Sequence, residues 1–446
     1  MKKIFTISVA CALCTTLNAE TIKVLTIQPS EEIPEMQAPY ISIMGLTLSA
    51  NGDYIGGVLE QGQGLFVADS RTGEVKYKLT PDGAELRNID NNGLAIGVDD
   101  ARGGLTYDFT TGAVTTIYAP EEYKYFLGEA LTNDGSTLFG SCVGTGFATY
   151  AYYTNDGKDW KALPYPTDEQ LGAFADQIRK ESAVKQASGD GKVLLGNLGG
   201  FAIPTLWVMN DKGEYEVDFF PARFVKLTEE DRNDPTKPLY AISGMYGNLL
   251  SNNGRYVIML GLDEDPDTGK GYGVPAIYDT VTKELKIFSE PQEIDDRGTG
   301  LYPTAIADDG TFIGTIGEPS TNSFGSFIWK AGEPQAELLI TAFPEFGVVF
   351  GDSDYYGFNV PTGISADGSK ILGYTFYSDD YYDESSPAFY RTYIIDCGED
   401  NAVDAIETEG SVNAIYSIDG RSLNTLSKGI NIVRQADGKV KKILKR

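Results

Sequence analysis

The sequence predicts an all-β protein, a seven-bladed β-propeller, because one phrase returns seven times along the chain. Over residues 363–373, its fullest form, an apolar residue and a serine lead into an Asx-Gly pair, and an apolar pair and a second glycine follow. Asx-Gly suits a two-residue hairpin in which both residues have positive φ, so we expect it to join the two inner strands of each blade. The seven pairs are Asn51-Gly52, Asn92-Gly93, Asp134-Gly135, Asp190-Gly191, Asn253-Gly254, Asp309-Gly310 and Asp367-Gly368.

The second half of each copy supports the same fold. An apolar strand, a turn and another strand follow, as in residues 65–68 before Thr72-Gly73. Two hairpins per copy are typical of four-stranded propeller blades, and a β-sandwich array is the main alternative. A glycine after each Asx-Gly turn lets a strand bend or approach a neighbour closely. These glycines are Gly56, Gly97, Gly140, Gly196, Gly314 and Gly373, and the fifth copy departs with a later Gly261.

The seventh copy is incomplete. Residues 388–395 give one outer strand, and a polar linker then begins at Cys397. An unassigned apolar strand lies at the other end of the chain, over residues 22–27. We expect it to close the ring as the outermost strand of the last blade, since closure removes exposed strand edges.

The composition excludes several classes of function. A formal charge of −28 repels phosphate backbones, so nucleic acid and anionic membranes are not expected as partners. The chain has no histidine, which excludes Ser-His-Asp and Cys-His catalysis and every metal site that needs imidazole. Carboxylate pairs could still cleave glycosides, but with 64 acidic residues such a pair is a weak signal.

The N-terminus has the pattern of a secretory leader. Two lysines precede a short apolar run over residues 4–13, and residues 17–19 fit a small-residue cleavage site. The run is too short to cross a bilayer, and we expect no transmembrane segment elsewhere. After cleavage only Cys142 and Cys397 remain, and we expect both thiols to be unpaired. The expected organisation is a signal peptide over 1–19, the propeller over 20–400 and a tail over 401–446.

Two insertions have helix signals. Thr167 with Gln170 forms a capping-box pattern, which predicts a helix running to about Glu181. A second candidate begins at Thr228, with three acidic residues in its first turn, and ends before Pro235.

Loops of the fifth to seventh copies are rich in aspartate and tyrosine. Alternating carboxylates followed by a glycine resemble a calcium loop, with Asp263, Asp265 and Asp267 as ligands, although a solvated acidic hairpin is the alternative. Adjacent tyrosines could stack on sugar rings or on a partner protein, or pack beneath a loop. These candidate ligand-binding residues are Tyr355, Tyr356, Tyr381 and Tyr382.

The last 36 residues change in character and become basic, and their alternation predicts four short strands. This stretch resembles the C-terminal sorting domain of the type IX (Por) secretion system of Bacteroidetes. The resemblance implies transport across the outer membrane by that machinery, followed by removal of the tail or its attachment to surface polysaccharide. It rests on residues 416–421, residues 428–434 and the lysine-rich end, with Tyr416, Asp419, Gly420, Arg421, Lys428 and Gly429 as the motif.

The sequence therefore predicts an exported, non-enzymatic protein of the cell surface or medium, or of the periplasm if the tail does not function. We expect its ligand, a glycan or a protein, on the propeller face that carries the insertions of the fourth to seventh blades. The alternatives are a carbohydrate-active enzyme that uses propeller carboxylates and a structural module of the cell envelope. No cofactor is expected other than calcium. The blade phrase also looks like the repeats of exported propeller families, which supports fold rather than activity.

Overall fold

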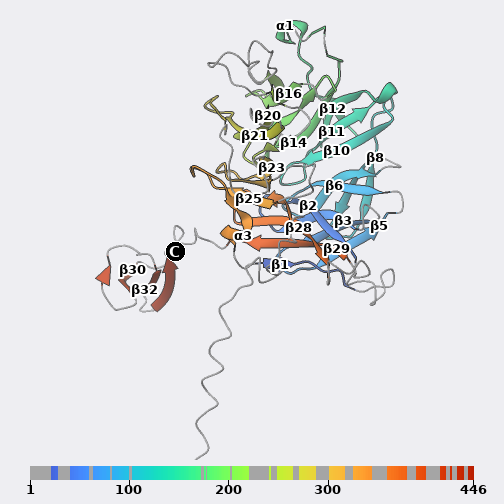
Figure 1. Cartoon of the computed structure of the whole chain (residues 1–446). Coiled ribbons are helices and arrows are strands. Elements are labelled where there is room, and N and C mark those ends of the chain that lie inside the picture. Colours follow the sequence, from blue (N-terminus) through green and yellow to red (C-terminus); the bar gives the residue numbers. More distant parts are fainter. Residues whose placement is uncertain are drawn as a thin grey trace, which may run out of the picture. The chain divides into compact units, whose positions relative to one another are not determined.

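The chain forms a seven-bladed β-propeller and a separate small sheet in this computed structural model, which confirms the predicted all-β fold (Figure 1). Two compact units divide it, Met1–Asp396 and Cys397–Arg446. The structure describes residues 22–28, 41–59, 64–80, 83–99, 103–171, 175–176, 178–200, 203–219, 241–242, 249–264, 271–287, 301–316, 325–343, 359–378, 388–397, 412–417, 422–423, 429–435 and 440–445.

The first four blades are antiparallel sheets of four consecutive strands each. The first two are β2 (Ile43–Leu48), β3 (Tyr54–Leu59), β4 (Gly64–Asp69) and β5 (Val75–Leu79), then β6 (Ala84–Ile89), β7 (Leu94–Asp99), β8 (Gly103–Asp108) and β9 (Val114–Ile117). The next two are β10 (Tyr125–Leu131), β11 (Leu138–Val143), β12 (Thr149–Thr154) and β13 (Trp160–Ala162), then β14 (Ser182–Ala187), β15 (Val193–Leu198), β16 (Ile203–Met209) and β17 (Tyr215–Phe219).

The last three blades follow the same plan with one variation each. Blade 5 has an inner strand in two pieces, β18 (Ala241–Ile242) and β19 (Leu249–Leu250), then β20 (Tyr256–Glu264), β21 (Gly271–Asp279) and β22 (Leu285–Ile287). Blade 6 has β23 (Leu301–Ile306), β24 (Phe312–Ile316), β25 (Gly325–Trp329) and a two-residue outer strand β26 (Glu337–Leu338). Blade 7 has β27 (Val360–Ile364), β28 (Lys370–Ser378), β29 (Ala388–Asp396) and the N-terminal β1 (Ile22–Val24).

The N-terminal strand closes the ring as predicted. β1 pairs antiparallel with β29, with Ile22 opposite Ile395 (Figure 1). Blade 7 is also fixed to blade 1 through the buried hydroxyl of Thr392, which donates to Ile43 O at 2.8 Å and accepts from Gly45 N–H at 2.7 Å. Because this hydroxyl is fully buried, the two bonds fix the seam between the ends of the ring in one register.

The Asx-Gly turns join inner and second strands, but their conformation differs from the expectation. All seven glycines have positive φ, between +69° and +94°, whereas none of the preceding Asx residues does. The connection is longer than two residues, because Ser365 N–H bonds Lys370 O and Gly368 N–H bonds Ser365 O. Asp367 instead contributes acceptors, taking bonds from the Ser369 N–H at 3.0 Å and the Ser365 hydroxyl at 2.6 Å. The Asx side chain therefore stabilises the turn without itself adopting a left-handed backbone.

The second glycine is required by a β-bulge in the inner strand. In blade 3 the register shifts between Gly128 and Ala130, and Gly140 lies opposite Gly128. A Cβ on Gly140 would lie 2.0 Å from the carbonyl oxygen of Leu127. The predicted close approach of a neighbour is therefore confirmed, and only glycine allows it.

Blades 1 and 5 explain the irregular copies of the phrase. In blade 1, Gly57 rather than the predicted Gly56 lies opposite the residue before the bulge. In blade 5, β18 pairs with Gly261 and Leu262, and β19 pairs with Val257 and Ile258. The buried Met259 lies at the position that is glycine in the other copies.

The helix predictions are wrong in length or untested. Thr167 and Gln170 form the expected reciprocal cap. The N–H of Thr167 donates to Gln170 Oε1 at 2.9 Å, and the N–H of Gln170 donates to Thr167 Oγ1 at 3.3 Å. The helix α1 (Asp168–Leu171) is nevertheless a single turn, because Leu171 already reaches the core and anchors the segment there. Among the described residues, the other helices are a 3₁₀ turn (Thr145–Phe147) and α3 (Leu339–Ala342), and the candidate at Thr228 lies outside the described residues.

The hydrophobic cores lie between neighbouring blades. Leu65 and Val67 of blade 1, for example, pack with Leu86, Leu105 and Tyr107 of blade 2. Each sheet thus buries its faces only against its neighbours, as a radial repeat requires. Cys142 is buried and Cys397 half-buried, and no disulfide joins these described cysteines. No described helix has the length and hydropathy needed to cross a membrane.

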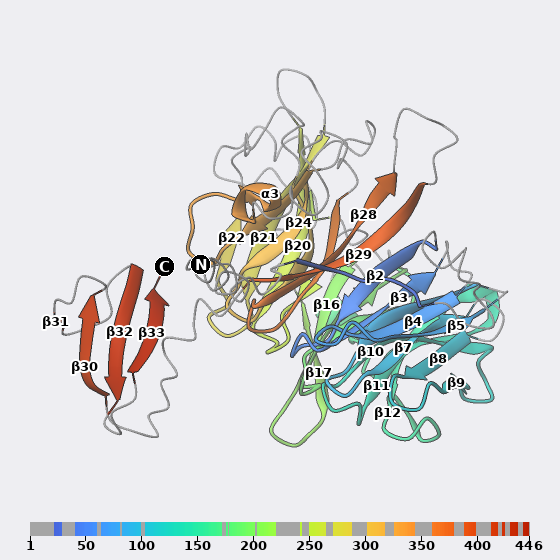
Figure 2. The same ribbon diagram turned by 90° about the horizontal axis from the view of Figure 1, so that it is seen from below.

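The C-terminal unit is one antiparallel sheet with the strand order β31-β30-β32-β33 (Figure 2). It contains the four strands expected from the sequence: β30 (Val412–Ser417), β31 (Ser422–Leu423), β32 (Gly429–Gln435) and β33 (Val440–Lys445). Tyr416 lies in β30 and Gly429 begins β32, whereas the other four motif residues lie outside the described part. The resemblance to a sorting domain stays a prediction.

Candidate functional site

The residues singled out by the sequence lie almost entirely outside the described part of the chain. This holds for Asp265, Asp267 and all four tyrosines, Tyr355, Tyr356, Tyr381 and Tyr382. Asp263 lies in β20, where its backbone pairs with Tyr272. Among the described residues, no three potential metal ligands come close enough to hold an ion. The calcium loop and the tyrosine surface therefore stay predictions.

The two ends of the blades differ in their described strands. We call the end with the Asx-Gly turns the turn face and the opposite end the loop face. Two hairpins are long there, because β20, β21, β28 and β29 have nine residues each where the matching strands of the other blades have five to seven. Figure 2 shows β28 and β29 extending together from blade 7.

The axial channel is constricted at the turn face by a ring of hydrogen bonds. The residue before each Asx bonds to its counterpart in the next blade, as in Asn133 N–H to Gly189 O at 2.8 Å and Ala366 N–H to Ala50 O at 2.7 Å. Two steps use side chains instead, and one of them is Asn253 N–H to Asp308 Oδ1 at 2.6 Å. The seven turns thus form a continuous collar.

Side chains of the bulged residues link several described blades to their neighbours along the channel. Thr304 donates its hydroxyl to Pro361 O at 2.6 Å, and Thr362 donates to Gly45 O at 2.7 Å. The bulged residues of blades 2, 3 and 4 are Arg87, Glu129 and Lys185.

These three charged residues form an ion cluster across three blades. Glu129 is only 5 % exposed, and its Oε1 accepts from Arg87 Nη1 at 2.5 Å and from Lys185 Nζ at 2.8 Å. Burial acts to lower the pKa of Arg87, but the charge of Glu129 overrides this and raises it. Sequence reasoning missed the cluster. Each member nevertheless lies three residues before the residue that begins its turn, which is Asp90, Thr132 or Ser188, and an alignment of the seven copies places all three in one column.

The axial channel is small and polar. Its volume is about 230 Å³, and amide and hydroxyl side chains such as Asn88, Asn133, Gln186 and Thr47 line it together with Arg87. Sites for organic ligands usually enclose about 300–1,000 Å³. The described channel therefore suits water and small ions.

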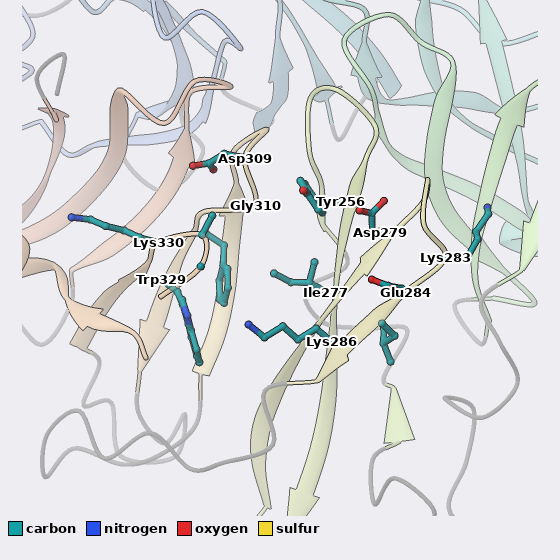
Figure 3. Close-up of a pocket in the computed structure, with 14 residues that line it drawn as sticks. Tyr256, Ile277, Asp279, Lys283, Glu284, Lys286, Asp309, Gly310, Trp329 and Lys330 are labelled. Carbon is teal, nitrogen blue, oxygen red and sulfur yellow. The ribbon is translucent and has the colours of Figure 1, made fainter. Parts of the chain in front are cut away.

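A larger hollow of about 600 Å³ lies between blades 5 and 6, and we call it the 5–6 groove (Figure 3). Its floor is apolar, with Tyr256 and Ile277 half-buried and Phe312 and Trp329 nearly fully buried. In Figure 3 the side chain of Lys286 runs from its strand into the hollow toward Trp329. The remaining lining residues are Asp279, Lys283, Glu284, Leu285, Asp309, Gly310, Lys330, Ala331 and Gly332.

The 5–6 groove exists because blade 6 departs from the packing seen between blades 1 and 2. There Phe109 packs on Tyr54, with ring centroids 5.4 Å apart, and Lys76 Nζ bonds Phe109 O at 2.7 Å. By strand register, Tyr256 and Lys286 correspond to Tyr54 and Lys76, and Ala331 corresponds to Phe109. The methyl group of Ala331 leaves unfilled the space that an aromatic ring occupies in blade 2.

Two charged side chains of the groove are already committed to other contacts. Asp279 accepts from Arg255 at 2.9–3.0 Å and from two turn N–H groups; burial acts to raise its pKa, but these bonds lower it. Lys283 reaches across to Asp218 of blade 4 at 2.9 Å. The other charged residues that line the hollow are of both signs: Lys286 and Lys330 are positive, and Glu284 and Asp309 are negative.

Many described carboxylates serve the fold in the same way. Asp69, Asp108, Asp156 and Asp279 accept backbone N–H groups in the turns before outer strands. Asp134, Asp190, Asp309 and Asp367 do so in the turns of the collar. Eight of the 64 acidic residues are thus explained by turn construction.

Comparisons with known proteins support the fold alone. No family model matches the chain, and no curated protein matches it. An oligogalacturonate lyase solved in complex with manganese is 12 % identical, with 85 % of this chain and 97 % of that chain covered and a TM-score of 0.50. The oligogalacturonate lyase of Vibrio parahaemolyticus is 11 % identical, with coverage of 85 % and 98 % and a TM-score of 0.47. TolB from Acinetobacter baumannii is 14 % identical, with a TM-score of 0.37, and the match covers 67 % of this chain and 64 % of TolB. These proteins and this chain are similar as β-propellers.

Proposed function

We propose that the chain is a non-catalytic binding module that takes a segment of a partner protein into the 5–6 groove. The observation that carries this proposal is the missing aromatic ring: Ala331 stands where Phe109 fills the corresponding space between blades 1 and 2. Tyr256 and Ile277 of the apolar floor are therefore partly accessible, and accessible apolar surfaces with polar rims are typical of ligand sites.

The lining favours a polypeptide over a sugar. Ile277 and Leu285 offer aliphatic contacts that suit an apolar side chain of the partner. Lys286, Glu284 and Asp309 offer both signs of charge at the rim, which suits a segment that carries both.

The test uses two substitutions that exchange the packing of the two interfaces. Peptides selected on the full chain from a displayed library should bind at least tenfold more weakly to Ala331→Phe, because the new ring fills the groove. Phe109→Ala, the matched control in blade 2, should leave peptide affinity unchanged. Equal affinity of the wild type and Ala331→Phe would refute the groove as the site. Release of reducing sugar from a polysaccharide panel would refute the non-catalytic assignment.

We also propose that the protein is exported, with removal of residues 1–19 and recognition of the tail by the type IX machinery. Support comes from the leader pattern and from the tail's forming a compact unit of its own. The chain, expressed in bacteria with and without a working type IX system, should reach the cell surface or medium only in the former. Its mature N-terminus should be Glu20. Accumulation in the periplasm of both strains would show that the tail does not act as a sorting signal.

A further inference from the structure

A second hollow lies between blades 2 and 3, and its lining differs in character from that of the 5–6 groove. We call it the 2–3 groove; its volume is about 1,030 Å³. Tyr118, Tyr152 and Trp160 line it together with the hydroxyls of Thr106, Thr115 and Thr116. Tyr118 is 74 % exposed, the largest value among the exposed large hydrophobic residues described. The wall is thus aromatic and hydroxylated rather than aliphatic.

The aromatic wall is rigid. Trp160 packs on the fully buried Phe126, with ring centroids 4.5 Å apart. Tyr152 is held by Tyr123, both through an edge-on ring contact at 5.4 Å and through a bond of 3.1 Å between their hydroxyls. Side chains fixed in this way lose little conformational entropy when a ligand stacks on them.

The surface continues to the loop face through a strained, exposed phenylalanine. Phe147 has φ +65° and is 71 % exposed, and Lys124 Nζ lies 5.1 Å from its ring centroid. A bulky residue with positive φ is a true outlier, and the cost is not offset by burial of the ring. Tyr123, which holds Tyr152, also lies 5.6 Å from Tyr150 beside this segment. The strain and the exposure together indicate that the ring serves a contact outside the chain.

The charge of the groove restricts the ligand. Glu121, Glu122 and Asp156 line it against one cation, Lys158. An acidic wall on a chain of formal charge −28 repels polyanions such as uronate or sulfated polymers. Flat aromatic faces beside hydroxyl groups suit the apolar faces and hydroxyl groups of an uncharged sugar ring.

We propose that the 2–3 groove binds a neutral polysaccharide, with sugar rings stacked on Tyr118 and Trp160. This site is separate from the 5–6 groove and does not depend on the function proposed for it. A partner protein is the competing occupant, and the threonine hydroxyls along the aromatic wall favour the glycan.

The test measures affinity of the full chain for soluble mixed-linkage β-glucan, mannan and amylose, with polygalacturonate as the anionic comparison. Trp160 provides an intrinsic fluorescence signal, because Trp207 and Trp329, the other two tryptophans, are at most 3 % exposed. At least one neutral polymer should bind and shift this fluorescence, and polygalacturonate should not.

Variants separate stacking from stability. Tyr118→Ala should weaken binding about tenfold, whereas Tyr118→Phe, which keeps the ring, should stay within about twofold of the wild type. Phe147→Gly should weaken binding while keeping or raising the melting temperature, because glycine accepts this φ without strain. Val281→Ala, on a 72 % exposed residue of blade 5, is the matched control and should leave affinity unchanged.

Three results would overturn the proposal. They are failure of every neutral polymer to bind, binding that Tyr118→Ala leaves intact, and binding of polygalacturonate that equals that of the neutral polymers. A protein ligand whose binding Tyr118→Ala abolishes, in the absence of any glycan binding, would assign the groove to a protein partner instead.

Discussion

The ion cluster in the axial channel predicts that one carboxylate contributes strongly to stability of the ring. Glu129 accepts from Arg87 of blade 2 and Lys185 of blade 4 while it is itself almost inaccessible to water. Glu129→Ala removes the shared acceptor and leaves two cations close together in the middle of the channel. The substitution should therefore weaken both contacts of blade 3 with its neighbours.

The expected loss of stability follows from the burial of the Glu129 carboxylate. Removal of one partner of a buried ion pair costs about 3–5 kcal/mol. The side chains of Arg87 and Lys185 are 27 % and 33 % exposed, so channel water can solvate them and we expect a cost below that range, about 2–3 kcal/mol. With an unfolding entropy of about 2 cal/mol/K per residue, the propeller unit gives roughly 0.8 kcal/mol/K and a fall in Tm of about 3–4 °C.

The assay compares urea unfolding of the wild type, Glu129→Ala and Glu85→Ala. Glu85 is the matched control, because it also approaches Arg87 but at 4.0 Å and with a 52 % exposed side chain. Glu85→Ala should lower the free energy of unfolding by about 0.5 kcal/mol or less. A double-mutant cycle with Arg87→Ala then isolates the coupling. If Glu129→Ala and Glu85→Ala unfold at the same urea concentration, the cluster does not couple the blades and the reasoning is wrong.

Three further predictions concern the turns and strand contacts. Lys283→Gly should raise the free energy of urea unfolding by about 0.5–1 kcal/mol. Lys283 has φ +60°, and relief of this strain should outweigh the loss of its exposed ion pair with Asp218. A loss of stability would show that the ion pair dominates. Gly140→Ala should lower the free energy of unfolding by about 2–3 kcal/mol or more, because the new Cβ would lie 2.0 Å from a carbonyl oxygen. Gly73→Ala should lower it by only about 1 kcal/mol, because Gly73 has φ +75° but open space around it. Equal losses would refute the steric account. Hydrogen bonds from the Thr132 hydroxyl and from Ser136 lower the pKa of Asp134 to about 2, so its contribution is complete above the unfolded pKa of about 4 and is lost as pH falls toward 2. The melting temperature of Asp134→Ala should accordingly fall less than that of the wild type between pH 5 and pH 2.

The sequence was sufficient for the ring, since the signals for it are local and repeated. A glycine at a turn position, such as Gly368, indicates a positive φ, and seven copies of the same pattern strengthen that prediction. The closing strand could be assigned by elimination, as residues 22–27 were the one strand without a blade. The physical role of Asp367 was misjudged, because a side-chain acceptor and a left-handed backbone favour the same residue type.

The candidate sites could not be predicted in the same way, because they depend on contacts between blades. Nothing near Ala331 in sequence shows that it lines the same groove as Tyr256 and Lys286 of the preceding blade; that follows only from the folded structure. The length of α1 was overestimated for a related reason. Its capping box at Thr167 is local, but the position where Leu171 enters the core is set by the neighbouring strands.

Both grooves lie where one position of the repeat lacks a large apolar side chain, and this connects the fold to the proposed binding. Phe109 fills the space between blades 1 and 2; by strand register the corresponding residue is Asp156 in blade 3 and Ala331 in blade 6, and these residues line the two grooves. The collar, the bulges and the turn glycines are the same in nearly every blade, so they determine the ring rather than the ligand. Binding specificity in this protein should therefore change through the residue at the Phe109 position of each blade. Exchange of that residue between blades should move a groove around the ring while the collar hydrogen bonds, and with them the fold, stay intact.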